Sequence, residues 1–171
     1  KEKLSSSKKE DNISGYILMP GEDPYRKITE NLFVKLFVDK RSCFVGEPVV
    51  ATFKLFSRLQ SKSEIIKNPG FYGFSVNDMI SLDDRVKETE RVNGKDFDVH
   101  TIRKVQLYPL TAGDFIIDEM KIDNKVEFSR SMVSKKTEQE ISEGILNNEN
   151  DEASNPGTEV FETNLSTEAI A

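Results

Sequence analysis

The sequence predicts an all-β fold, built as a sandwich of about seven short strands. Runs of β-branched and aromatic residues recur between residues 31 and 130 at the spacing of about 8–12 residues that such folds show. Turn signals rich in Gly, Pro, Asn and Asp separate these runs, and no apolar period of helix length competes with them. This pattern is typical of an immunoglobulin-like β-sandwich.

Composition divides the chain into unequal parts. The hydrophobic content is 36%, which is low against the roughly 45–50% of ordinary domains, a figure that includes Gly. Residues 131–171 hold nine acidic and two basic side chains, a net charge of −7, whereas the whole chain carries −6. We therefore expect an extended lead-in or linker over 1–30, a sandwich domain over 31–130 plus 158–171, and an acidic mobile insertion over 131–157.

The first predicted elements follow from local patterning. The lead-in is expected to be extended because Pro20, Gly21 and Pro24 interrupt any periodicity. Leu32–Val38 and Val49–Ser57 are predicted strands, since both are rich in β-branched and aromatic residues. Alternation in the second strand predicts one core-facing set, namely Val49, Ala51, Phe53 and Leu55.

The middle of the chain predicts turns and shorter strands. Residues 58–70 are polar and end in Asn68-Pro69-Gly70, which predicts a turn. Phe71–Val76 predicts an aromatic strand with an internal glycine, and Val86–Arg91 predicts a weaker strand. Asn93-Gly94 predicts a hairpin, because both residues accept positive φ.

The last strands complete the expected sandwich. Phe97–Leu107 predicts a strand with one face formed by Phe97, Val99, Thr101, Arg103, Val105 and Leu107. Arg103 is the misfit in that set, which a bulge or an edge position would explain. Further strands are predicted at Phe115–Ile122, whose register stays ambiguous, at Lys125–Ser129 and at Glu159–Leu165.

Catalytic side chains are scarce in this sequence. The only histidine is His100, and alternation places it with Asp98 and Lys104 on a polar strand face, where a solvated side chain is favoured over a general base. The glycines follow no phosphate-loop or dinucleotide spacing, and no nucleophile–base pair is evident. We therefore expect no enzymatic activity, no catalytic residues and no cofactor.

Metal binding and nucleic-acid binding are also disfavoured. Asp78, Asp83 and Asp84 share a predicted loop and could bind Ca²⁺, but their spacing matches no EF-hand loop, so turn formation is favoured and no metal site is predicted. Cys43 is the single cysteine, which we expect to fill the core. Residues 1–130 are near neutral with mixed signs, which argues against a nucleic-acid partner.

The feature most typical of a binding surface is the aromatic run after Pro69-Gly70. Phe71, Tyr72 and Phe74 lie at a predicted loop-to-strand junction, where aromatic side chains can anchor a partner. The alternative interpretation packs alternate residues of this run into the core. The chain has no tryptophan, which weakens a carbohydrate-binding platform.

Four ordered segments resemble the bacterial aerotolerance family BatD. Val45–Val50, leading into Phe53–Arg58, is similar to the family's VGEPV…YKLYTR element, and Pro69–Phe74 is similar to its Pro-x-Phe-x-Gly-Phe element. Val92–Phe97 resembles the family's NGK hairpin, and Leu107–Ile117 resembles its LFP-x-x-x-G-x-x-x-I element, while Asn31–Val34 resembles its first strand. The chain departs from the family in having phenylalanine at 56 and 97, where tyrosine is usual, and in its acidic insertion.

The resemblance implies one internal immunoglobulin-like domain of a larger envelope protein. Such proteins are anchored in the inner membrane, face the periplasm and are linked to oxygen or envelope stress tolerance. The implied partners are other Bat-type proteins with von Willebrand A domains or tetratricopeptide repeats, and no catalytic residues are carried over. The chain has no apolar run of about 18 residues, so we expect a soluble fragment of a membrane-associated parent.

The predicted function is therefore a non-enzymatic scaffold for protein–protein interaction. The alternative is an extracellular carbohydrate-binding or adhesin module.

Overall fold

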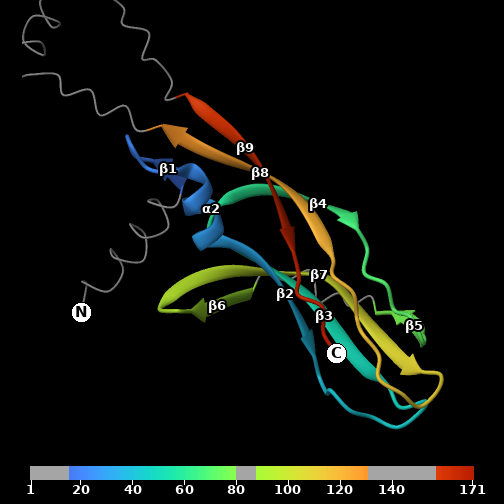
Figure 1. The fold of residues 1–171 in the computed structure, drawn as a ribbon. Helices are drawn as coiled ribbons and strands as arrows, with labels where there is room; N and C mark the ends of the chain where they lie inside the picture. Colours follow the sequence, from blue (N-terminus) through green and yellow to red (C-terminus); the bar gives the residue numbers. More distant parts are fainter. Residues whose placement is uncertain (1–15, 80–87, 131–156) are drawn as a thin grey trace, which may run out of the picture.

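The computed structural model describes residues 16–79, 88–130 and 157–171, and it shows a sandwich of two β-sheets (Figure 1). The first sheet has the order β2-β3-β7, and β5 and β6 also pair with β7. These strands are β2 (Leu32–Val38), β3 (Val49–Ser57), β5 (Phe74–Asp78), β6 (Glu88–Val92) and β7 (Lys95–Pro109). All pairings in this sheet are antiparallel.

The second sheet is built around β8, which pairs with β4 and β9 in antiparallel fashion and with β1 in parallel. Its strands are β1 (Ile17–Leu18), β4 (Gln60–Lys67), β8 (Lys121–Arg130) and β9 (Thr158–Ser166). The all-β sandwich predicted from the sequence is confirmed.

The main core lies between the sheets. Ala51 and Phe53 of β3 and Val105 of β7 are fully buried, and they pack in one cluster with Val126 and Phe128 of β8. Burying these apolar side chains is the main favourable contribution to folding. The core-facing set predicted for β3 is correct, since all four of its members belong to this cluster.

The segment before β2 is not the extended lead-in that the prolines predicted, as far as the structure describes it. Helix α2 spans Pro24–Asn31 and buries Ile28 against the core. Asp23 caps the helix by accepting a hydrogen bond from the Tyr25 amide, and Pro24 suits the first helical position because its missing amide proton would have no partner there. The proline thus begins a helix rather than preventing one.

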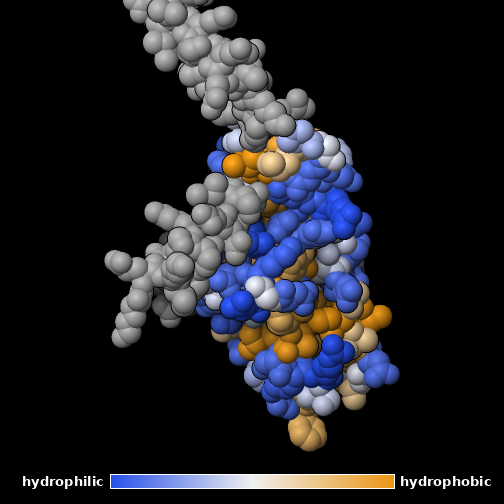
Figure 2. Space-filling view, turned by 90° about the vertical axis from the view of Figure 1, so that its left-hand side faces the viewer, coloured by the Kyte–Doolittle hydropathy of each residue, from blue (hydrophilic) through white to orange (hydrophobic). Residues whose placement is uncertain are grey.

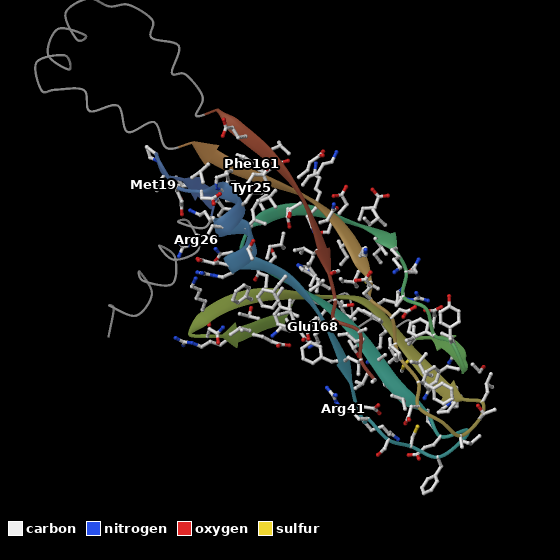
Figure 3. The ribbon with its side chains drawn as sticks, in the orientation of Figure 1. Met19, Tyr25, Arg26, Arg41, Phe161 and Glu168 are labelled. Carbon is white, nitrogen blue, oxygen red and sulfur yellow. The ribbon has the colours of Figure 1, made fainter. Side chains whose placement is uncertain are left out.

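Helix α2 also packs against the second sheet. The rings of Tyr25 in α2 and Phe161 in β9 meet edge to face with centroids 5.9 Å apart, and they lie side by side in Figure 3. Residues 1–15 of the predicted lead-in lie outside the described residues.

Residues 58–70 were predicted as a polar stretch that ends in a turn at Asn68-Pro69-Gly70, without a strand, but β4 occupies residues 60–67 and ends just before that turn. This strand lies at the edge of its sheet and has polar side chains on both faces, so it lacks the apolar alternation of a half-buried strand. Its Ser63 faces Asn124 of β8, which is fully buried. The hydroxyl of Ser63 donates a hydrogen bond of 2.5 Å to Oδ1 of Asn124.

A β-bulge in β7 separates two hydrophobic clusters. Phe53 pairs with Arg103 whereas Lys54 pairs with Thr101, so Ile102 is an extra residue. The bulge predicted as an explanation of Arg103 is present, but Phe97 and Val99 do not share a face with Val105 and Leu107. Phe97 and Val99 join a second cluster on the outer face of the sheet, together with Phe56, Phe33 and Val92.

The other predicted elements are shifted rather than absent. The Asn93-Gly94 hairpin forms with φ of 50° and 80°, and the last strand is found as β9. The aromatic strand begins only at Phe74, and Phe115–Ile122 contributes a single bridge, Ile117 to Ile170, before β8 begins. Residues 131–156 of the predicted insertion lie outside the described residues.

Candidate interaction site at one end of the sandwich

Three loops meet at one end of the sandwich, at the lower right in Figure 1. They join β2 to β3 (residues 39–48), β4 to β5 (68–73) and β7 to β8 (110–120). The Gly46 amide donates to the Pro109 carbonyl at 3.0 Å, and the Leu110 amide donates to the Gly73 carbonyl at 3.0 Å. Two backbone hydrogen bonds therefore hold the three loops together.

The residues next to these hydrogen bonds are apolar and exposed. Phe44 is 84% exposed, Tyr72 78%, Leu110 61% and Val45 55%. We call these four residues the apolar tip. Hydrophobic surface is indeed concentrated in the lower part of the described molecule in Figure 2, with a smaller area at the top. Clustered apolar side chains at exposed positions are the usual mark of an interaction surface.

The loop that carries Phe44 is held by its own polar contacts. One oxygen of Glu47 accepts a hydrogen bond from the Phe44 amide at 3.0 Å, and the other accepts one from Nζ of Lys40 at 2.7 Å. The hydrogen bond from Lys40 lowers the pKa of Glu47 and raises the pKa of Lys40, so both groups stay charged at neutral pH. These two hydrogen bonds restrain the loop that carries Phe44, which reduces the entropy lost when a partner binds.

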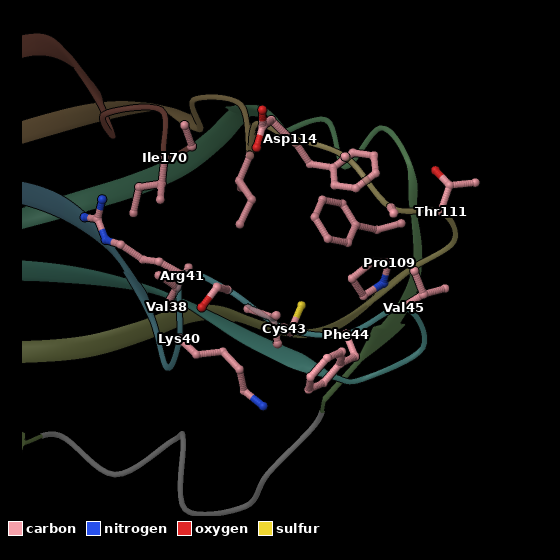
Figure 4. A pocket seen from close by; sticks show the side chains of 18 residues that line it. Val38, Lys40, Arg41, Cys43, Phe44, Val45, Pro109, Thr111, Asp114 and Ile170 are labelled. Atoms are coloured by element: carbon pink, nitrogen blue, oxygen red, sulfur yellow. The ribbon is translucent and has the colours of Figure 1, made fainter.

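A cavity of about 450 Å³ lies behind the apolar tip. Its apolar lining includes Val38, Cys43, Phe74, Phe115, Ile117 and Ile170 (Figure 4). Reciprocal hydrogen bonds of 2.8 and 3.1 Å join the backbones of Ile117 and Ile170 along one wall. Phe44 and Val45 of the apolar tip also line this cavity, and the sulfur of Cys43 points into it (Figure 4).

The three binding residues predicted from the sequence have different surroundings. Phe71 packs against the core, with its ring 6.5 Å from that of Phe53 and beneath the guanidinium of Arg103 at 5.5 Å. Tyr72 is exposed at the tip, whereas Phe74 stacks obliquely on Phe115 at 5.1 Å and lines the cavity. Only Tyr72 therefore has the surroundings of a direct partner contact.

Sequence reasoning missed Phe44, Val45 and Leu110 as candidate contacts. All three stand beside turn residues and outside any alternating strand, in the stretches Phe44-Val45-Gly46 and Pro109-Leu110. A large apolar residue at a turn has no core to face, so its position in the sequence could have indicated an exposed contact residue. Cys43, predicted to fill the core, is half-buried and packs against the core from the cavity side.

The groups considered for catalysis or metal binding do not converge. His100 is exposed on β7, and Asp78 pairs with Arg103 at 3.0 Å, while Asp83 and Asp84 lie outside the described residues. Among the residues that the structure describes, no three His, Cys, Asp or Glu side chains are grouped to hold a metal ion. The described helix is also too short to cross a membrane.

The fold and this site together define a β-sandwich domain that presents apolar loops on a rigid frame. No protein-family model, no curated protein and no solved structure matches the chain. The resemblance to the BatD family therefore stays a prediction.

Proposed function

We propose that this chain is a non-enzymatic protein-interaction module that binds its partner through the apolar tip. The main support is a pair of backbone hydrogen bonds, from Gly46 to Pro109 and from Leu110 to Gly73. They bring exposed apolar residues of three loops together. Large side chains in such a cluster gain free energy when a partner covers them. Aromatic anchors such as Phe44 and Tyr72 are the residue types enriched among interface hot spots.

The strand order supports an immunoglobulin-like assignment. Constant-type immunoglobulin domains have strands ABED in one sheet and CFG in the other. In chain order β2, β3 and β7 correspond to A, B and E, and the interrupted edge of β5 and β6 corresponds to D. The strands β4, β8 and β9 then correspond to C, F and G.

The wider biological role rests on the resemblance to BatD. On that basis, the module belongs to a protein anchored in the inner membrane and faces the periplasm. It helps to assemble an envelope complex with von Willebrand A-domain and tetratricopeptide proteins, and this complex supports oxidative or envelope stress tolerance.

The test is a pull-down from a membrane fraction with the whole parent protein. We expect the wild type to recover the von Willebrand A-domain partner, and Phe44→Ser combined with Tyr72→Ser to reduce recovery at least about tenfold, because two central anchors are removed. Ile66→Ser is the matched control, since Ile66 is 56% exposed on β4 of the other sheet. Unchanged recovery by the double variant would contradict the proposed tip, and selective binding on a glycan array would favour the adhesin alternative.

A further inference from the structure

A second hollow lies at the opposite end of β2 from the apolar tip. It is a groove of about 370 Å³ between the end of α2 and the β6–β7 hairpin, which are neighbours at the left of Figure 1. Phe33 of β2 and Phe97 of β7 line it, with ring centroids 5.1 Å apart in an edge-to-face arrangement. Val92 adds a further apolar side chain, so the groove can receive a flat or branched apolar group.

The charges around this groove are unbalanced. Lys35 and Lys95 line it, and neither forms an ion pair with another residue that the structure describes. The ammonium of Lys35 lies 5.2 Å from the centroid of the Phe33 ring. Glu30, an acidic residue that also lines the groove, forms an ion pair with Arg26, whose Nε lies 3.0 Å from Oε1 of Glu30.

Another lysine of the same sheet, Lys54, has its positive charge neutralised by neighbouring carboxylates. Lys54 lies on the outer face between two carboxylates, at 2.7 Å from Glu90 and 3.5 Å from Glu88. Lys35 and Lys95 have no such neighbours in the described part of the chain, although the whole chain carries a net charge of −6. Local positive charge beside an aromatic groove, on an acidic protein, is complementary to a ligand that is both anionic and apolar.

We infer that this groove binds an acidic peptide segment of a partner protein through a large apolar side chain flanked by carboxylates. The apolar side chain packs against the half-buried Phe33 and Val92, and the carboxylates accept hydrogen bonds from Lys35 and Lys95. A nucleic acid is disfavoured, because phosphate backbones are bound by longer rows of basic residues than these two lysines form. The groove is a separate surface from the apolar tip, so the module can hold two segments at once.

The test measures binding of a fluorescein-labelled peptide, EEFEEF, to the full chain by fluorescence anisotropy. We expect saturable binding that weakens with salt, and much weaker binding of the peptides EEAEEA and KKFKKF. Lys35→Glu and Lys95→Glu should each weaken binding about fivefold or more, because exposed ion pairs contribute modestly and reversal adds repulsion. Lys62→Glu is the matched control, since Lys62 is exposed on β4 of the other sheet.

Circular dichroism and thermal unfolding of each variant verify that the fold is intact. Equal loss of binding in Lys62→Glu would overturn the inference, because the effect would then be one of net charge. Tighter binding of a labelled oligothymidylate than of EEFEEF would assign the groove to nucleic acid instead. Absence of saturable peptide binding up to about 1 mM would also refute it. None of these outcomes depends on the tip, so Phe44→Ser should bind the peptide as the wild type does.

Discussion

The ring of Phe115 fills the space beside Gly73. A Cβ added to Gly73 would lie 2.3 Å from Cε1 of that ring, and φ of Gly73 is +84°. Its carbonyl also accepts the hydrogen bond from Leu110 that joins two loops of the apolar tip. Glycine is thus required here for backbone conformation and for the close approach of an aromatic ring.

Gly73→Ala should lower the free energy of unfolding by about 2–4 kcal/mol, about 1 from positive φ and the rest from displacing Phe115. Gly94→Ala is the matched control: its φ is +80° and no atom lies within 4 Å of an added Cβ. It should cost only about 1 kcal/mol. Chemical denaturation measures both, and equal losses would mean that Phe115 moves away freely.

Sequence reasoning found the strands that bury one face and missed those that do not. Alternation in Val49–Ser57 predicted its core set correctly, because the second sheet covers that strand's inner face. The edge strand β4 gave no such signal, since its inner face carries Ser61 and Ser63 beside a single apolar residue, Ile65. Helix α2 was missed because Pro20 and Pro24 predicted an extended segment, although proline is favoured in the first turn, where Pro24 lies.

The candidate site was only partly predictable for a related reason. Tyr72 could be found because aromatic residues beside Pro69-Gly70 stand out in the sequence. The apolar tip also needs Leu110, which lies 38 positions further along the chain. Only the pairing of β5 with β7 brings these two loops together, and local patterns do not contain that pairing.

The bulge at Ile102 places one extra residue between the two halves of β7. Deletion of Ile102 would remove the bulge, because Thr101 would then directly precede Arg103 opposite Lys54 and Phe53. The two halves of β7 would keep their opposite faces, so both clusters could still form. We therefore expect a loss of only about 2 kcal/mol or less in the free energy of unfolding, mainly from the lost packing of the Ile102 side chain.

Ile102→Ala is the control for that deletion. It keeps the bulge and should cost about 2 kcal/mol or less, because Ile102 is only half-buried. Thermal and denaturant unfolding compare the two variants, whose stabilities should agree within about 1 kcal/mol. A deletion variant much less stable than Ile102→Ala would show that the bulge itself is required.

The buried Asn124 depends on Ser63. Ser63→Ala removes the donor to Oδ1 of Asn124, which is fully buried, and should cost about 1–3 kcal/mol of unfolding free energy. Adding Asn124→Leu removes the unsatisfied group at similar volume, so the double variant should return to within about 1 kcal/mol of the wild type. Denaturant unfolding of both variants measures this coupling. Additive losses would show that the two side chains act independently.

The loop of Phe44 should loosen in acid. Because the pKa of Glu47 is lowered from its ordinary 4.5, its contribution is fully present above about that pH and is lost as pH falls through the lower folded value. The raised pKa of Lys40 acts at the other limit: its contribution is present below the ordinary 10.5 and is lost as pH rises through the folded value. The protection of the Phe44 amide against exchange, measured by NMR relative to its intrinsic rate at each pH, should therefore fall in acid, and Glu47→Gln should show lower protection already at neutral pH. Glu64→Gln, on the exposed face of β4, should leave that exchange unchanged. Exchange that is equally fast in wild type and Glu47→Gln would mean that Glu47 does not hold the tip in place.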